Sequence, residues 1–229
     1  TEGLVGSEMC IRDRDKNTDH FLDNSQIHYL KKVLKLKEGE ELFIFDGDGK
    51  KYLTVFNGNS STRIIEKVTK PKIFLTTVLI PVLKKNQFEF MLQKCVEIGV
   101  KNIKVYISEK TKNIFSFDKE KSKYERYQAI IKSAFLQSEN FYLPELEIFE
   151  SIESFNFASF NSICVLDQFA ENNATFNMEY DLLISGGEFG FDECEREIFN
   201  KNQASYMKLG ENILRAETAP LVALSRINI

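Results

Sequence analysis

The residues best suited to chemistry lie near the carboxyl end, in a loop that contains three glycines. The stretch ISGGEFGFDECE, residues 184–195, begins as an apolar strand and ends in carboxylates. Glycine allows a backbone to approach a ligand closely and to take positive φ. The stretch does not fit GxGxxG, and no GxxxxGK[ST] occurs in the chain. Because Glu188 would repel a phosphate, we expect a ligand without phosphates. The alternative is a plain turn between a strand and a helix.

A second loop repeats this arrangement between SYMKLG and the last predicted helix, ETAPLVALSRI. Within it, Arg215 lies between the acidic residues Glu211 and Glu217. An arginine at this point could hold a bound anion or a base edge, or it could form an ordinary surface salt bridge. Thr218 has the side chain to cap the following helix. The same capping chemistry is predicted for Asp192 and Glu195 in the first loop.

Strands and helices alternate in the region that must position these loops, residues 72–229. Buried strands are predicted in KIFLTTVLIP, IKVYIS, SICVLD, DLLIS and SYMKLG, and helices in FEFMLQKCVEIGV, KYERYQAIIKSAFLQS, DECEREIF and ETAPLVALSRI. This alternation indicates an α/β fold, a parallel sheet covered on both faces. The glycine loop follows the strand DLLIS directly. Ligands of such sheets bind beyond the carboxyl ends of the strands.

The preceding region, residues 15–71, is predicted to be a small β domain with one helix. The helix is expected in HYLKKVLKL, and alternating strands flank the tight-turn sequence at residues 46–49. Pro71 is a plausible linker point. Residues 1–14 are unlike a natural protein start, because MCIRDR matches the translation of a sequencing adapter. We expect them to be a foreign leader on a truncated gene and leave them out of the fold prediction, with Cys10.

The composition of the chain limits the classes of function that it can have. The formal net charge is −4, but the first two thirds of the chain are net basic and the last third is strongly acidic. Such asymmetry is compatible with a basic face for a phosphate backbone, and equally with solvated lysines spread over surface helices. The four cysteines form no CxxC pair, which argues against a metal site and for reduced thiols. With no apolar run long enough for a membrane span, we expect a cytoplasmic protein.

Four segments, in order, resemble one family of RNA methyltransferases. ISGGEFGF is similar to the IGPEGGF loop of SPOUT-class enzymes, and LGENILRAETA to their LGxRILRxETA. FMLQKCVEIGV is similar to the family's FxxQKxxELGV, and HYLKKVLKLKEGEELFIFDGDGKKY to its N-terminal HHLxxVLRxxxGDxxxxFDGxG. Together these segments identify the RsmE type, whose members methylate uridine N3 in 16S ribosomal RNA.

The resemblance implies properties that periodicity does not. The family has a PUA-like β-barrel domain, expected here in residues 15–71, and a SPOUT domain with a C-terminal trefoil knot, expected in residues 72–229. It acts as a homodimer on the small ribosomal subunit and uses S-adenosylmethionine but no metal. The residues that this implies for cofactor binding are Leu166, Ile184, Gly186, Gly187, Glu188, Gly190, Leu209, Gly210, Ile213, Leu214, Arg215 and Thr218.

Catalytic and RNA-binding roles follow from the same resemblance and from the chemistry of uracil. Arg215 is expected to stabilise negative charge on the uracil carbonyls, and Glu188 or Glu217 to accept the N3 proton. RNA backbone contacts are expected from lysines, namely Lys31, Lys32, Lys35, Lys50, Lys51 and Lys94.

The chain also departs from the family pattern. Phe189 replaces a family glycine, Gly187 replaces the proline, and Asn212 replaces an arginine. Residues 134–140 lack a glutamate and an arginine that the family carries. These departures keep two alternatives open, a non-catalytic RNA-binding or ribosome assembly factor and a methyltransferase with another RNA target. A nucleotide-dependent oxidoreductase is disfavoured by the missing GxGxxG.

Overall fold

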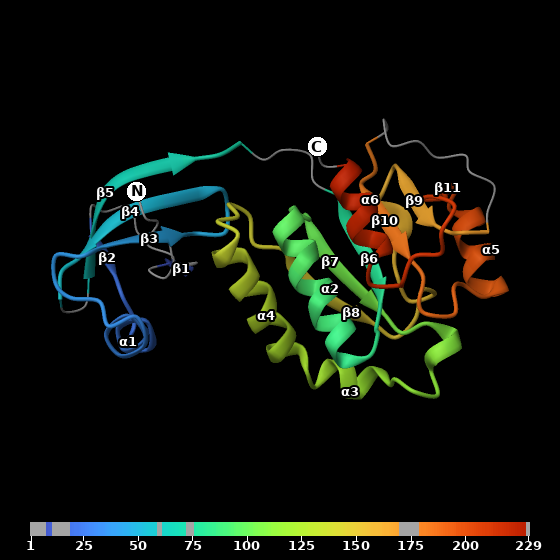
Figure 1. The fold of residues 1–229 in the computed structure, drawn as a ribbon, viewed down its shortest axis with the longest axis horizontal. Coiled ribbons are helices and arrows are strands. Elements are labelled where there is room, and N and C mark those ends of the chain that lie inside the picture. Colours follow the sequence, from blue (N-terminus) through green and yellow to red (C-terminus); the bar gives the residue numbers. More distant parts are fainter. Residues whose placement is uncertain (1–7, 11–18, 59–60, 72–75, 170–178, 228–229) are drawn as a thin grey trace. The chain divides into compact units, whose positions relative to one another are not determined.

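The chain folds into two compact units. The computed structural model describes residues 8–10, 19–58, 61–71, 76–169 and 179–227. The first unit contains residues 1–72 and 135–143, and the second contains residues 73–134 and 144–229 (Figure 1). The sequence did not indicate that residues 135–143 would belong to the first unit, because they continue directly from a helix of the second. In the described part of the chain, no helix has the length and apolar character needed to cross a bilayer.

A five-stranded sheet in the order β1-β3-β4-β5-β2 builds the first unit. Its neighbouring strands are antiparallel, except that β1 runs parallel to β3. A register shift between Leu53 and Thr54 interrupts the long pairing of β4 with β5, as a β-bulge does when it bends a strand. The strands are β1 (Glu8–Cys10), β2 (Asp19–Phe21), β3 (Glu41–Phe45), β4 (Lys50–Phe56) and β5 (Ser61–Thr69).

Strand β1 lies within the segment that we expected to be foreign. Its residues pair in register with β3, Glu8 opposite Phe43 and Cys10 opposite Phe45. The remainder of that segment, residues 1–7 and 11–14, lies outside the described residues. The foreign origin of residues 1–14 stays a prediction, and their exclusion from the fold prediction left out this edge strand.

The tight turn predicted at residues 46–49 is confirmed and joins β3 to β4. The Asp46 carboxylate accepts hydrogen bonds from the backbone N–H groups of Asp48 at 2.8 Å and Lys50 at 3.0 Å. Gly49 has φ +99°, and an added Cβ would lie 2.5 Å from the Tyr142 hydroxyl oxygen. Both the backbone conformation and the close approach therefore require glycine at this position.

The helix of the first unit begins earlier than HYLKKVLKL suggested. Helix α1 covers Asn24–His28 and continues as one π-helical turn over Tyr29–Val33. Asp23 caps it in a reciprocal capping box with Gln26, which fixes the start. Leu30 is fully buried in a core with apolar residues of the sheet, and the buried members of this core are Leu22, Leu30, Leu36, Leu42, Ile44 and Phe56.

The second unit contains the predicted parallel sheet, with six strands in the order β11-β9-β10-β6-β7-β8. Sequence reasoning missed β8, a sheet edge whose exposed and buried residues alternate. A half-exposed edge strand lacks the continuous apolar run by which the central strands were found. The strands are β6 (Thr77–Pro81), β7 (Asn102–Tyr106), β8 (Glu145–Phe149), β9 (Ile163–Leu166), β10 (Leu182–Ser185) and β11 (Ser205–Met207).

Helices cover both faces of this sheet. Helices α2 (Lys85–Ile98) and α4 (Tyr124–Gln137) lie side by side in Figure 1, and Phe88 packs edge-on against Tyr127 between them. Helix α6 (Ala219–Ile227) contacts α2 and β10. Helix α5 (Glu193–Lys201) buries Phe199 in a hydrophobic core of the second unit. This core also contains Leu79 of β6 and alternate residues of β9 and β10. Shorter helical segments are η2 (Glu109–Thr111), α3 (Phe117–Lys121) and η3 (Phe157–Ser159).

Candidate active site

A pocket of about 650 Å³ lies in the second unit, lined by residues that follow the carboxyl ends of its parallel strands. The loops after β9, β10 and β11 supply most of the wall, as expected for ligand sites of α/β sheets. The lining residues are Gln87, Lys110, Leu166, Asp167, Gln168, Phe169, Ser185, Gly186, Gly187, Glu188, Phe189, Gly190, Phe191, Arg196, Met207, Leu209, Ile213, Leu214, Arg215, Ala216, Glu217 and Ala219.

The glycine loop forms one wall as a tight turn. The N–H of Gly190 donates to the carbonyl of Gly187 at 3.0 Å, and Gly190 has φ +66°. A Cβ added to Gly186 would lie 3.2 Å from the ring of Phe191, so the buried ring leaves little space for a side chain there. The loop ends at Asp192, whose predicted capping box with Glu195 is confirmed.

Two side chains from the β7 region fix the backbone of this loop. The Tyr106 hydroxyl donates to the carbonyl oxygen of Ser185 at 2.9 Å, and the Lys110 ammonium donates to the carbonyl oxygen of Phe189 at 2.8 Å. Tyr106 is fully buried, and its pKa is raised well above the usual range by burial and by the nearby carboxylates of Glu195 and Asp192. It therefore stays a neutral donor.

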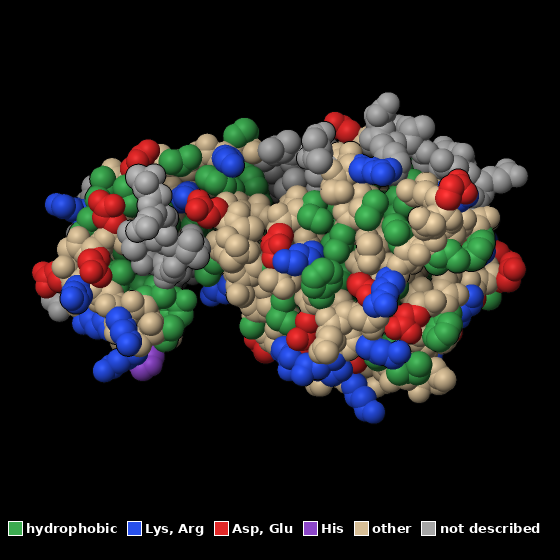
Figure 2. Space-filling view, in the orientation of Figure 1, with side chains coloured by type: hydrophobic (Ala, Val, Ile, Leu, Met, Phe, Trp, Pro, Cys, Tyr) green, Lys and Arg blue, Asp and Glu red, His purple; other side chains and the backbone are tan. Residues whose placement is uncertain are grey.

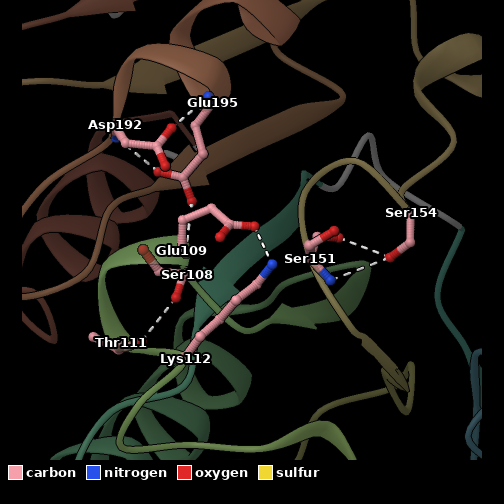
Figure 3. Close-up of polar contacts among 8 residues, drawn as sticks. All are labelled: Ser108, Glu109, Thr111, Lys112, Ser151, Ser154, Asp192 and Glu195. Atoms are coloured by element: carbon pink, nitrogen blue, oxygen red, sulfur yellow. Dashed lines mark hydrogen bonds and ion pairs between the residues drawn. The ribbon is translucent and has the colours of Figure 1, made fainter.

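A buried carboxylate joins α5 to the loop after β7 (Figure 3). Glu195 is 3% exposed, and its carboxylate accepts from the backbone N–H groups of Asp192 at 2.9 Å and Glu109 at 3.4 Å, and from the Ser108 side chain. Burial raises the pKa of Glu195, while these hydrogen bonds oppose the rise. Glu109 also forms an ion pair with Lys112. The loops on either side of the pocket are thus connected through one carboxylate.

Ser185 ends β10 and presents a polar atom without a protein partner. The residue is 1% exposed, and among the described residues its Oγ has no hydrogen-bond partner. It also lines the pocket. A buried hydroxyl left unpaired costs free energy, on the order of 1–3 kcal/mol. A polar ligand in the pocket would supply the missing hydrogen bond.

The loop after β9 contributes polar groups that the sequence analysis did not assign. Asp167, 7% exposed, forms an ion pair with Arg196 of α5, and its Oδ1 accepts from the N–H of Phe169 at 3.0 Å. The Gln168 amide donates to the backbone carbonyls of Gly210 at 3.2 Å and Glu211 at 3.4 Å. Asp167 could have been found from sequence, because SICVLD places it at the carboxyl end of a predicted strand.

The last loop carries the predicted catalytic arginine. Arg215 has an 81% exposed side chain whose Nη1 lies 3.9 Å from Oε1 of Glu217. Glu217 is 10% exposed, and both of its carboxylate oxygens lie 3.5 Å from Nε2 of Gln87. Lys84 lies 3.6 Å from Glu188, which lines the pocket. These long contacts leave Arg215 and Glu188 accessible to a substrate.

Most of the residues expected to bind the cofactor line this one pocket. Three of the expected residues do not line it. Ile184 is buried within β10, the carbonyl oxygen of Gly210 accepts from the Gln168 amide, and the N–H of Thr218 donates to the carbonyl oxygen of Arg215 at 2.9 Å. Their roles stay predictions, as do those of the rest. The expected residues that line the pocket are Leu166, Gly186, Gly187, Glu188, Gly190, Leu209, Ile213, Leu214 and Arg215, with Glu217.

The lysines expected to hold RNA differ in their surroundings. Lys31, Lys32 and Lys35 are exposed in and after the π-helical turn of the first unit. Lys51 is 14% exposed, pairs with Glu139 and lies 3.8 Å from the centroid of the Phe43 ring. These contacts give Lys51 a structural role within the first unit beside the predicted one.

The other two lysines have acidic partners. Lys50 lies 3.8 Å from Asp46, and Lys94 pairs with Glu97 at 2.8 Å on α2 of the second unit. Basic and acidic side chains interleave over the face of the second unit seen in Figure 2. Two alternatives were a basic face for a phosphate backbone and solvated lysines spread over surface helices. This distribution agrees with the second at least as well as with the first.

No cysteine is among the described residues that line the pocket. Among the described residues, no three or more His, Cys, Asp and Glu side chains gather as a metal site. Cys95 and Cys164 are buried, and burial raises the pKa of each thiol to about 12. Cys194 is exposed.

The described residues thus form a parallel α/β unit, with a polar pocket at the carboxyl ends of its strands, and a small β unit. A family model for the RNA methyltransferase domain matches residues 70–228, and one for the RNA methyltransferase PUA domain matches residues 22–76. The chain belongs to this RNA methyltransferase family.

Relatives agree with this assignment. The chain is 30% identical to ribosomal RNA small subunit methyltransferase E of Mesomycoplasma hyopneumoniae, covering 93% of this chain and 95% of the relative. It is 27% identical to the Synechocystis protein of the same name, over 90% of this chain and 72% of the relative.

The fold has close counterparts among solved structures. The Neisseria gonorrhoeae ribosomal RNA small subunit methyltransferase E, bound to S-adenosyl methionine, is 24% identical with a TM-score of 0.79, covering 95% of this chain and 94% of that one. A Legionella pneumophila protein in complex with SAM is 23% identical with a TM-score of 0.82, covering 98% of this chain and 97% of that one. These similarities show the fold.

Proposed function

We propose that the chain transfers a methyl group from S-adenosylmethionine to N3 of a uridine in 16S ribosomal RNA. The supporting observation is that the two loops similar to the family's cofactor loops, far apart in sequence, line one pocket. The curated relatives named above act on small-subunit ribosomal RNA by name. An RNA methyltransferase with this pocket is therefore proposed to share their cofactor and substrate.

The pocket's chemistry fits a polar cofactor that carries no phosphate. Ser185 supplies an unpaired hydroxyl, Asp167 a buried carboxylate, and Leu166 and Leu209 apolar wall. The carboxylate of Glu188 stands at the rim, where it would disfavour a phosphorylated ligand. S-adenosylmethionine combines a cationic, amino-acid part with an adenosine, so it suits acidic, hydroxyl and apolar groups together.

The proposed mechanism assigns one task to each polar side chain of the last loop. The bound cofactor supplies an electrophilic methyl group, so the uracil must present N3 as a nucleophile in line with it. Arg215 stabilises the negative charge that develops on the uracil carbonyl oxygens. Glu217 accepts the N3 proton, with Gln87 orienting its carboxylate. Glu188 is the alternative base from the opposite rim.

We further propose that the second unit contains a trefoil knot. Strand β11 pairs with β9 on the side away from β10, and the chain then returns to place α6 against α2 and β10. Gln168, in the loop after β9, hydrogen-bonds the returning segment at Gly210 and Glu211. These hydrogen bonds between segments far apart in sequence support the proposed knot.

The remaining proposals concern the first unit and the assembly. The PUA domain is proposed to be a β-barrel that contacts the RNA backbone, with Lys31, Lys32 and Lys35 as its most exposed candidates. The protein is proposed to act as a homodimer in the cytoplasm, where its ribosomal substrate is found. These statements rest on the family resemblance.

The proposed function is tested by incubating the full chain with S-adenosylmethionine and unmethylated small ribosomal subunits. Mass spectrometry of the RNA nucleosides should then show 3-methyluridine that depends on both the protein and the cofactor. Methylation at another base, or at a ribose oxygen, would show that uridine N3 is not the target atom. Cofactor binding without any product would favour the non-catalytic alternative.

A further inference from the structure

Three exposed apolar side chains gather around the mouth of the pocket. Of the nine exposed large hydrophobic residues in the described part of the chain, Phe169, Phe189 and Ile213 all line it, with exposures of 83%, 58% and 75%. They come from three different loops, which follow β9, β10 and β11. Apolar side chains that converge on one rim from separate segments mark a surface for a partner more often than scattered ones do.

Resting on the proposed function, we propose that Phe189 is a stacking platform for an unpaired base of the RNA substrate, with Phe169 and Ile213 completing the apolar rim. An unpaired base can stack on an aromatic ring whatever its sequence, because every base has a π-face. An enzyme that modifies a base must first remove it from its stack. The rim would receive the target uracil, or a neighbouring base, as it leaves the RNA.

The backbone that carries Phe189 is fixed, although its ring is exposed. Lys110 holds its carbonyl at 2.8 Å, and the turn closed by Gly187 and Gly190 bounds it on both sides. A ring on a fixed backbone loses only the freedom of two side-chain torsions on contact. The position is therefore suited to binding a planar group from solution.

Two exposed cations contact carboxylates that line the same pocket. Lys84 is 71% exposed and Arg215 is 81% exposed, and their acidic partners lie at 3.6 and 3.9 Å. Exposed ion pairs of this length contribute little free energy, so both cations can turn to an incoming phosphate or carbonyl. Aromatic rings beside accessible cations are the combination that single-stranded nucleic acids bind.

Phe189 also distinguishes this chain from the loop that it resembles. The family loop that ISGGEFGF resembles is expected to have glycine at this position. The cofactor wall is completed by main chain and by residues that lie deeper, including Ser185. Loss of the ring should consequently affect the RNA and leave the cofactor bound.

The test compares Phe189→Leu and Phe189→Trp with wild type, using full-length protein saturated with S-adenosylhomocysteine. The probe is a small-subunit RNA fragment with 2-aminopurine beside the target uridine, whose fluorescence is quenched by stacking. Phe189→Leu should weaken RNA binding roughly 5- to 100-fold and abolish the protein-dependent quenching, whereas Phe189→Trp should retain both. Ile114→Ala, a change at an exposed apolar residue of the second unit outside the pocket lining, is the control and should behave as wild type.

Several outcomes would overturn the inference. A loss of cofactor affinity with unchanged RNA binding would mean that the ring covers the cofactor. A change in oligomeric state would mean that it contacts a second copy of the chain, and wild-type behaviour would mean that the ring is merely solvated. If wild type itself binds no cofactor and methylates no RNA, the proposed function fails. If wild type is active and Phe189→Leu matches it, only this inference fails.

Discussion

The two loops that enclose the pocket are held in different ways. In the glycine loop the main chain is fixed, because Tyr106 and Lys110 each bind one of its carbonyl oxygens. The last loop is fixed at its two ends, by Gln168 at Gly210 and Glu211 and by Gln87 at Glu217. Between these ends Ile213 and Arg215 project into solvent.

This difference indicates that the two loops have different functions. A fixed main chain is suited to a ligand that must always take the same position, which is the requirement for the methyl donor. An exposed arginine on a loop held at both ends can pair with a substrate that arrives later. Changes that release the main chain of the glycine loop should therefore alter cofactor affinity, and changes to the exposed side chains of the last loop should alter turnover.

The largest effect is expected from Arg215→Ala. Loss of the guanidinium should lower kcat by about 10²- to 10³-fold, as for other groups that stabilise developing charge. The dissociation constant for S-adenosylmethionine should change less than about threefold, because the Arg215 side chain is 81% exposed. Arg215→Lys keeps the charge and should be intermediate. Turnover close to wild type in Arg215→Ala would remove this residue from the mechanism.

A smaller effect, on cofactor affinity and not on turnover, is expected from Lys110→Met. This variant loses the charge-assisted hydrogen bond to the Phe189 carbonyl. Because Lys110 is exposed, the cost should be about 1 kcal/mol, or roughly fivefold in cofactor affinity, with kcat at saturation nearly unchanged. Lys112→Met is the control, since Lys112 pairs with Glu109 and does not touch the glycine loop. Equal losses of cofactor affinity in the two variants would contradict a specific role of Lys110 in holding the glycine loop.

The smallest effect concerns Glu195, whose pKa is raised by burial. Between the usual pKa of a glutamate and this raised value, the folded state binds more protons than the unfolded state. Lowering the pH through this window must therefore stabilise the wild type relative to Glu195→Gln, which cannot take up the proton. Urea unfolding at a series of pH values from 7 down toward the usual pKa of a glutamate should show the difference growing as the pH falls. A constant difference would mean that Glu195 titrates normally.

Local chemistry made part of this site predictable from sequence. The capping pair Asp192 and Glu195, the glycine turn and the end of α2 at Gly99 each follow from a few neighbouring residues. The parallel sheet follows from the alternation of apolar strands and helices. In each case the residues that determine the structure are adjacent in the chain.

Pairings between distant segments were not predictable in this way. The ion pair of Asp167 with Arg196 joins the loop after β9 to α5. The hydrogen bonds from Tyr106 and Lys110 reach residues 79 positions further along the chain. Residues 135–143 join the first unit through tertiary contacts, such as Lys51 with Glu139. Periodicity carries no information about these contacts.

The most direct test of the central claim is a calorimetric titration of the full chain with S-adenosylmethionine and with S-adenosylhomocysteine. If the two loops form a cofactor pocket, both compounds should bind saturably at one site per chain. Lys110→Met should weaken both, and Arg215→Ala should leave both nearly unchanged. Heat of dilution alone from a folded sample, for both compounds, would contradict the account.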